Sequence, residues 1–213
     1  MASFPNAASG AIVRDIAATI VENSAYLSEI DGKIGDGDHG VNMSKGFRRA
    51  AERIDDGASL SGAMSILSDV LISEIGGSMG PLYGMLFAEM AEAIEDRGEI
   101  DAPAFAAMLR AGLEGVAAVG SAKVGDKTMM DALVPAVETC EASVNRGETL
   151  EDVLSATAAA AEAGRESTRD MVAKVGRASR LGERSRGVLD AGATSCAMIV
   201  RGLCEGSAAR IGT

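Results

Sequence analysis

Residues 60–94 read LSGAMSILSDVLISEIGGSMGPLYGMLFAEMAEAI, two apolar stretches joined by a glycine-rich turn. Large apolar residues recur every three or four positions in both stretches, which places them on one face of a helix. These residues are Leu60, Met64, Leu67, Leu71 and Ile75, then Leu82, Leu86, Met90 and Ile94. A short connection makes consecutive helices antiparallel neighbours. The stretch therefore predicts two antiparallel helices.

The same spacing recurs through the chain, and no comparable stretch alternates with period two. Asp101 and Thr149 are typical residues at helix starts, and the pair Gly76–Gly77 is a stop signal. We expect an all-α, single-domain, antiparallel up-down bundle of about eight helices covering residues 1–213. The expected helices lie near residues 8–30, 41–55, 59–75, 81–96, 102–119, 129–145, 149–174 and 192–207.

The composition limits the class of protein. Of the 213 residues 47% are apolar, and the formal net charge is −11, which argues against nucleic acid or an anionic membrane as the main partner. Three cysteines without a CxxC pair are typical of buried thiols in a reducing compartment. We see no signal peptide and no membrane-spanning run. These features predict a cytoplasmic protein.

If the helices alternate in direction, every second connection lies at the same end of the bundle. The connections at 31–40, 76–80, 120–128 and 175–191 are then neighbours, and they are the ones richest in Gly, Asp, Lys and Arg. We therefore expect one functional site at that end.

The first of these connections contains IGDGDHGVN, residues 34–42, with the chain's one histidine. Its glycines satisfy G-x-G-x-x-G, but a helical pattern precedes them rather than a strand, so a dinucleotide fold is excluded. An EF-hand starting at Asp36 would need Glu at its twelfth position, where this chain has Phe47. There is no Walker A lysine motif either.

The remaining interpretation is a magnesium site that holds the phosphates of a nucleotide. Mg²⁺ takes hard oxygen ligands, usually one or two carboxylates with water and phosphate oxygens. Asp31, Asp36 and Asp38 exceed what one ion normally uses, which indicates two ions sharing ligands. The alternative is that these aspartates are ordinary turn and cap residues. His39, beside them, is expected to contact the ligand, without a role as nucleophile or base.

The other three connections leave alternatives open. GGSMGPLYG, residues 76–84, is either an anion cradle at a helix start or an ordinary turn. In GDKTMMD, residues 125–131, either Asp126 caps a helix, or Lys127 or Thr128 faces phosphate. Residues 176–195 contain four arginines within ten positions, which either clamp a nucleotide or bind an acidic partner, and then Asp190 as a helix cap.

Four ordered motifs give a family resemblance. IGDGDHGVNMSKGF, GGSMGPLYG, GDKTMMDAL and GRASRLGERSRGVLDAGATS closely resemble the nucleotide-binding L subunit of dihydroxyacetone kinase, from about residue 10 to the C-terminus. The resemblance implies an antiparallel eight-helix barrel with the nucleotide at one rim. Where the family usually has Ala-Ser this chain has Ser78-Met79, and Ala191 replaces a common proline.

The resemblance also implies the site residues. Asp31, Asp36 and Asp38 correspond to the ligands of two Mg²⁺ ions. The nucleotide contacts correspond to His39, Gly40, Val41, Asn42, Ser78, Met79, Gly120, Met129, Arg177, Asp190, Ala191 and Gly192. No protein nucleophile is implied, because phosphoryl transfer depends on positioning and charge neutralisation.

By the same resemblance, the chain is a phosphotransferase subunit that binds ADP or ATP and acts within a hetero-oligomer. A separate K subunit holds a short-chain ketose covalently, and in one branch of the family an M subunit rephosphorylates bound ADP. Two other hypotheses stay open: a nucleotide-sensing regulator of a partner protein, and a helical interaction protein with an incidental cation site.

Overall fold

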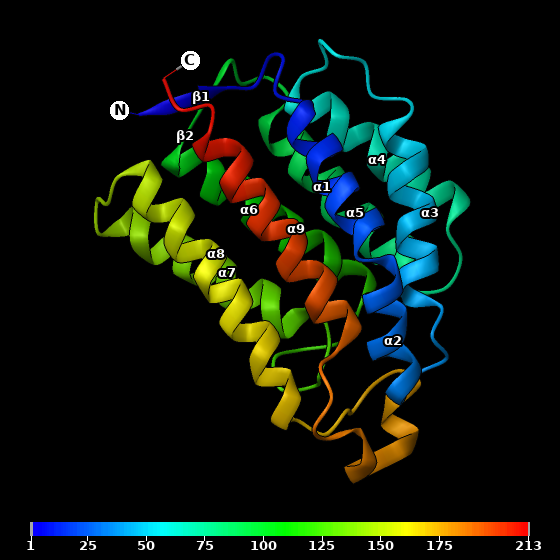
Figure 1. Ribbon diagram of the computed structural model, residues 1–213. Helices are drawn as coiled ribbons and strands as arrows, with labels where there is room; N and C mark the ends of the chain where they lie inside the picture. Colours follow the sequence, from blue (N-terminus) through cyan, green and yellow to red (C-terminus); the bar gives the residue numbers. More distant parts are fainter. Residues whose placement is uncertain (1, 213) are drawn as a thin grey trace.

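The computed structural model describes residues 2–212, within which the chain forms nine α-helices, two 3₁₀ segments and two three-residue strands (Figure 1). The helices are α1 (Ala11–Glu22), α2 (Ser24–Ile34), α3 (His39–Ala51), α4 (Leu60–Glu74), α5 (Met79–Ile94), α6 (Ala102–Val119), α7 (Met130–Asn145), α8 (Leu150–Ser167) and α9 (Ala191–Ala208). The 3₁₀ segments are η1 (Thr168–Asp170) and η2 (Ala178–Ser185), and the strands are β1 (Ser3–Pro5) and β2 (Glu99–Asp101).

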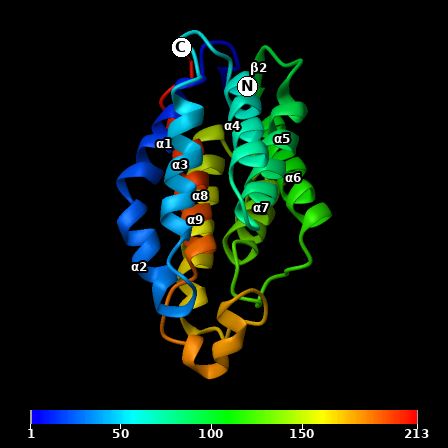
Figure 2. The ribbon, with the colours of Figure 1, turned by 90° about the vertical axis from the view of Figure 1, so that its right-hand side faces the viewer.

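The helices form a closed ring. From α3 to α9 each helix packs against the next one in sequence, and α1 contacts both α3 and α9, which closes the circle. Figure 2 shows the walls of this barrel from the side. Counting α1 and α2 as one bent helix, the ring has eight members, so the predicted all-α antiparallel barrel is confirmed.

Apolar stripes hold the ring together. Leu67 and Leu71 in α4 and Leu86 and Met90 in α5, predicted to share one face, are almost completely buried. Burying each such side chain stabilises the fold by about 1.5–3 kcal/mol. Between α3 and α5, Phe47 and Phe87 make an edge-to-face contact with their ring centroids 6.0 Å apart.

Several predicted helix starts are confirmed by side-chain caps. The amide of Ala104 donates to the Asp101 carboxylate at 3.0 Å, and the amide of Asp152 donates to the Thr149 hydroxyl at 3.2 Å. Asp190 caps α9 in the same way, accepting from the amide of Ala193 at 2.7 Å. Each such cap satisfies a backbone N–H that the helix itself leaves unpaired.

Three predicted boundaries were wrong. The helix expected over 8–30 breaks at Asn23, whose backbone (φ −92°, ψ 8°) leaves the helical region, and α2 then runs on to residue 34. Asp31 therefore lies in the last turn of α2 rather than in a loop. The helix expected over 149–174 ends at Ser167 and gives way to η1, and the 175–191 connection contains η2, which kinks at Gly182.

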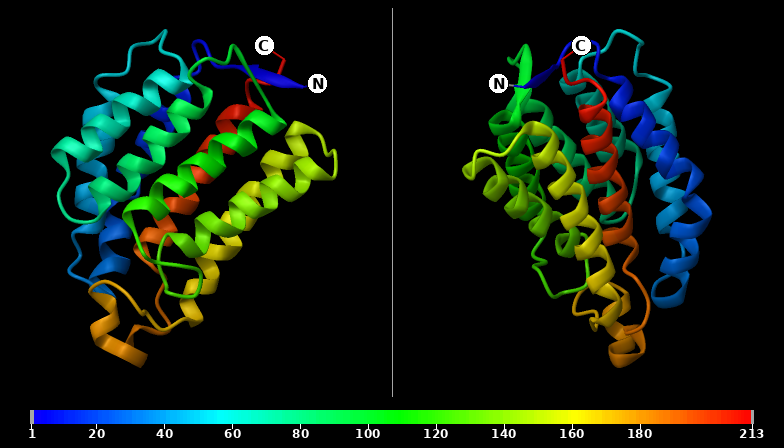
Figure 3. Two further views of the ribbon diagram at one scale, coloured as in Figure 1. Left: turned by 180° about the vertical axis from the view of Figure 1, so that it is seen from behind. Right: turned by 60° about the vertical axis from the view of Figure 1, so that its left-hand side comes forward.

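The sequence pattern also missed the small sheet. β1 pairs antiparallel with β2, with Ser3 opposite Asp101, and each strand is too short to show a period of two. This pair lies at the end of the barrel where both termini lie (Figure 3). The connections α2–α3, α4–α5, α6–α7 and α8–α9 gather at the opposite end, where η2 forms the lower edge in Figure 1.

α6 is long and apolar enough to cross a membrane by length and composition alone. Half of its apolar window is buried inside the barrel, where α6 packs between α5 and α7. Its hydropathy is therefore that of a wall helix in a helical core.

Candidate functional site

A cavity of about 670 Å³ opens at the end of the barrel where the four connections meet. It draws its lining from all four of them, as predicted from the alternation of helix directions. Fourteen positions anticipated from the sequence line it: Asp31, Asp36, Asp38, His39, Ser78, Met79, Gly120, Lys127, Thr128, Met129, Arg177, Asp190, Ala191 and Gly192.

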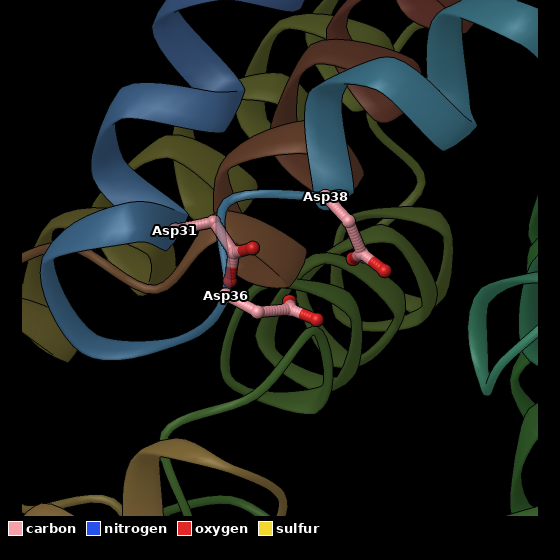
Figure 4. Close-up of side chains that lie close together, drawn as sticks. All are labelled: Asp31, Asp36 and Asp38. Atoms are coloured by element: carbon pink, nitrogen blue, oxygen red, sulfur yellow. The ribbon is translucent and has the colours of Figure 1, made fainter.

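Asp31 in α2 and Asp36 and Asp38 in the connection to α3 lie close together (Figure 4). One carboxylate oxygen from each of Asp31, Asp36 and Asp38 lies within 4.8 Å of the others. Asp31 comes from the last turn of α2, and Asp38 directly precedes α3. Three hard oxygen donors this close repel one another unless a cation lies between them, and such a donor set suits Mg²⁺.

Glycines allow this approach. A Cβ on Gly35 would overlap the carboxylate of Asp31, and Gly37 has φ +78°, a conformation that favours glycine. A Cβ on Gly40 would overlap the carbonyl oxygen of Ser24 in α2. The sequence IGDGDHG thus folds the acidic connection tightly between the end of α2 and the start of α3.

Arg177 is the arginine of the fourth connection that reaches this cluster. Its guanidinium pairs with the carboxylate of Asp36. Arg186 instead pairs with Glu183 at 3.0 Å and donates to the carbonyl of Asp170. Arg180 and Arg184 are exposed and do not line the cavity. Of these four arginines, for which a nucleotide clamp and a binding site for an acidic partner were the two readings, Arg177 alone lines the cavity.

His39 is held by residues that the sequence reasoning had not assigned. Its Nε2 lies 2.8 Å from the hydroxyl of Ser195 in α9, which in turn lies 2.7 Å from the hydroxyl of Tyr83 in α5. Burial lowers the pKa of His39 to about 4, opposed by the negative charge of Asp31. Ser195 and Tyr83 stand in the motifs GATS and GPLYG, so the motifs marked the segments without showing which side chains meet.

Lys127 does not extend into the cavity as a phosphate ligand would, although it contributes to the wall. It is 2% exposed, and its ammonium donates to the carbonyls of Ser185 and Val188 at 2.6 Å and of Met171 at 3.2 Å. Burial lowers its pKa. Of the two readings of GDKTMMD, phosphate contact through Lys127 is therefore wrong.

Thr128, the other candidate for phosphate contact, lines the cavity, and its hydroxyl accepts from the amide of Met130 at 3.2 Å. The alternative reading, a helix cap by Asp126, is wrong. Asp131, not Asp126, organises the third connection, since its carboxylate accepts from the amides of Gly125 at 2.5 Å and Thr128 at 2.7 Å. Asp126 accepts from the amide of Lys123 at 3.0 Å, within its own turn. The buried Asp131 thereby fixes the segment that leads to Met129 on the cavity wall.

Asp190 caps a helix and also has a raised pKa. While capping α9 it lines the cavity, and burial raises its pKa to about 7, with the hydrogen bond from Ala193 opposing and the charge of Asp131 adding. Ala191 and Gly192 follow it in the first turn of α9 and also line the cavity.

Three anticipated contacts lie outside the cavity lining. Gly40, Val41 and Asn42 occupy the first turn of α3, where Gly40 is buried against α2 and Val41 is 61% exposed. Much of the rest of the wall is apolar. Together with Met79 and Met129, its apolar residues are Ile34, Pro81, Leu82, Val116, Val119, Ala122, Met130, Val175 and Ala178.

Comparisons with known proteins identify the family and its relatives. A model of the DAK2 domain matches residues 33–205. The chain is 36% identical over 200 residues to the PEP-dependent dihydroxyacetone kinase 2, ADP-binding subunit DhaL, of Listeria innocua serovar 6a, covering 92% of each chain. It is 40% identical over 174 residues to the PEP-dependent dihydroxyacetone kinase, ADP-binding subunit DhaL, of Escherichia coli, covering 81% of this chain and 83% of the relative.

A solved structure shares the fold. The dihydroxyacetone kinase from C. freundii in complex with AMP-PNP and Mg²⁺ superposes with a TM-score of 0.67 at 27% identity, over 92% of this chain. The chain spans about a third of the length of that kinase, since the match covers 33% of it.

Proposed function

The chain belongs to the DAK2 domain family, and from this membership we propose that it is the nucleotide-binding subunit of a dihydroxyacetone-type kinase. In this role, residues 1–213 act as one nucleotide-binding domain in the cytoplasm and transfer a phosphoryl group to a short-chain ketose held by a partner. The observation that carries the proposal is the convergence of Asp31, Asp36 and Asp38 at the mouth of a cavity lined by all four connections.

The three carboxylates would hold two Mg²⁺ ions, which neutralise the phosphate charge when bound. The residues of the chain then position the nucleotide. Arg177 is placed to move from Asp36 to a phosphate oxygen, because a bidentate guanidinium suits either anion. Met79, Leu82 and Met129 provide apolar surface for the base.

The acceptor must come from elsewhere. A covalent ketose adduct of the kind proposed for the K subunit needs a free histidine, but the chain has one histidine and its Nε2 is already bonded to Ser195. We therefore propose a hetero-oligomer with a K-type, ketose-binding subunit. Because the two relatives described above are PEP-dependent, ADP is the proposed resident nucleotide, rephosphorylated by an M-type subunit.

A thermal melt in four buffers tests the site: without additions, with Mg²⁺, with ADP and EDTA, and with Mg²⁺ and ADP. A ligand at 1,000 times its dissociation constant adds about 4 kcal/mol to the free energy of unfolding, and each kcal/mol raises the midpoint of a domain this size by roughly 2–4 °C. We expect a rise on the order of 10 °C with Mg²⁺ and ADP together. ADP with EDTA should give almost none, because the aspartates repel the phosphates.

Asp36→Asn and Asp38→Asn should abolish this rise while leaving helical content unchanged. Asp69→Asn, the same change at an exposed site on α4, is the control and should keep it. Equal shifts with and without Mg²⁺ would place the nucleotide elsewhere. Binding of Mg²⁺ and ADP without phosphate transfer in the presence of K- and M-type partners would favour the nucleotide-sensing regulator instead.

A further inference from the structure

A chain of hydrogen bonds links three helices at the cavity wall. Tyr83 in α5, Ser195 in α9 and His39 at the start of α3 contact one another in that order, with the distances given above. Ser195 is fully buried, and Tyr83 is 1% exposed. Water therefore does not compete for these bonds, and the three side chains themselves determine which group donates in each bond.

The site determines which way the protons must face. His39 lines the cavity with Nε2 committed to Ser195, so Nδ1 is the ring nitrogen left for a ligand. Phosphate oxygens only accept hydrogen bonds, so a useful contact requires a proton on Nδ1. In that tautomer Nε2 must accept, and the Ser195 hydroxyl must donate to it.

The remaining bonds are consistent with this direction. If Ser195 donates to His39, its oxygen is free to accept from the hydroxyl of Tyr83 at 2.7 Å. The other acceptor within reach of the Tyr83 hydroxyl is the carbonyl of Gly192, at the longer distance of 2.9 Å. Burial raises the pKa of Tyr83 well above its ordinary value, so the phenol keeps its proton. The competing acceptors of Ser195 are the carbonyls of Ala191 and Gly192, at 3.1 and 3.2 Å. Both lie farther away than Nε2 at 2.8 Å, which has the shorter, more favourable distance.

We propose that Tyr83 and Ser195 are positioning residues that keep the proton of His39 on Nδ1, where it donates to a phosphate oxygen of the bound nucleotide. The proton order is Tyr83 to Ser195 to His39. This inference rests on the proposed function for the identity of the ligand, but the tautomer it requires is a property of the nucleotide-free protein as well.

The single histidine makes the tautomer directly measurable. With [¹⁵N]histidine labelling, the protein gives one imidazole in a nitrogen–proton NMR spectrum. We expect a protonated, pyrrole-type Nδ1 and a pyridine-type Nε2. Ser195→Ala should move the proton toward Nε2, the tautomer that a solvent-exposed histidine side chain prefers in water, and Tyr83→Phe should shift it less. A protonated Nε2 in the neutral ring of the wild type would overturn the proposal.

Affinity gives the second readout. A net hydrogen bond of ordinary strength corresponds to a loss of about two- to tenfold in affinity for ADP with Mg²⁺ in Ser195→Ala, measured by titration calorimetry. Ser68→Ala is the matched control, since Ser68 is 3% exposed and donates to the carbonyl of Gly84 at 2.8 Å away from the cavity lining. It should change neither the tautomer nor the affinity.

The two proposals fail separately. A wild type with its proton on Nδ1 that does not bind ADP with Mg²⁺ would refute the proposed function and leave the hydrogen-bond order standing. A wild type that binds ADP with Mg²⁺, and whose affinity and tautomer are unchanged by Ser195→Ala, would refute the positioning role and leave the proposed function standing.

Discussion

Some polar side chains near the cavity form hydrogen bonds to backbone groups instead of extending into the cavity. Lys127 is the clearest case, because its ammonium has three backbone carbonyls as partners, all within the long connection between α8 and α9. Its own backbone has φ +64°, which is unusual for a residue with a side chain. The lysine thus fastens the connection that carries Arg177 and Asp190 to the barrel.

Lys127→Met should lower the free energy of unfolding by about 1–3 kcal/mol, since it leaves buried carbonyls without a donor. Urea denaturation followed by circular dichroism measures the change. Lys45→Met, at an exposed position on α3, removes the same charge and is the control, with an expected effect within about 0.5 kcal/mol. Equal losses in the two variants would mean that charge alone matters.

At the level of single residues, the sequence predicted that the three aspartates lie together, but not which groups Lys127 and Ser195 bond to. Asp31, Asp36 and Asp38 were identified as a group because like charges at short spacing need a counter-ion. The partner of Lys127 could not be inferred, because the sequence does not show which carbonyls a connection leaves unpaired. Ser195 was missed for the same reason, since its partners are 112 and 156 positions away in the chain.

At the level of elements, close helix packing at the rim depends on small residues. Gly164 in α8 faces the start of α7, where a Cβ would overlap the carbonyl oxygen of Asp131. Asp131 also holds the third connection through its carboxylate. The spacing between α7 and α8 and the conformation of that connection are therefore coupled.

Gly164→Ala should destabilise the protein by about 1–3 kcal/mol, because the extra methyl forces α7 and α8 apart. A thermal melt should show a midpoint lower by several degrees. Gly57→Ala is the control, since a Cβ there meets nothing within 4 Å and its backbone is not in the left-handed region. If Gly164→Ala melts with the control, α8 tolerates the methyl without moving.

Cap residues in the sequence predicted where helices start, but the sequence did not show where a helix breaks. Asp101, Thr149 and Asp190 were recognised as helix caps, since the residue type and the hydrogen bond it makes are both local. The break at Asn23 was not, because the apolar spacing continues across it. After the break, α2 runs to residue 34, and its last turn places the carboxylate of Asp31 beside those of Asp36 and Asp38.

Across the whole molecule, the opposed titrations of His39 and Asp190 shape the dependence of stability on pH. The pKa of Asp190 rises from 3.8 to about 7, so between these values the folded state keeps a proton that the unfolded chain releases, and stability falls as pH rises. The pKa of His39 falls from 6.5 to about 4, so the unfolded chain binds the extra proton and stability rises with pH.

The two contributions nearly cancel in the wild type, and each variant should reveal the other. In EDTA, Asp190→Asn should become more stable as pH rises from 4 to 6.5, while His39→Gln should become less stable between 4 and 7, each by on the order of 3 kcal/mol. Urea midpoints over this range measure both slopes. Parallel slopes in the two variants would contradict the opposed assignment.

The placement of the site followed from topology more than from any one motif. Alternating helix directions predicted that the first, third, fifth and seventh connections would adjoin, and the cavity has lining residues from all four. Ring closure through α1 and α9 could not be inferred from the pattern, because it depends on how the helices tilt against one another.

The two ends of the described chain meet each other. The amide of Gly212 donates to the carbonyl of Ser3, the first residue of β1, at 3.2 Å. In Figure 1 the strand pair lies at the end of the barrel opposite η2, and the connections that line the cavity lie at the η2 end. An 18-residue helix such as α6 is about 27 Å long, which sets the scale of that separation. A second polypeptide fused to either end, or insertion of the whole domain into a host protein, would leave the opening of the cavity accessible. The fold is therefore compatible with a place inside a larger polypeptide.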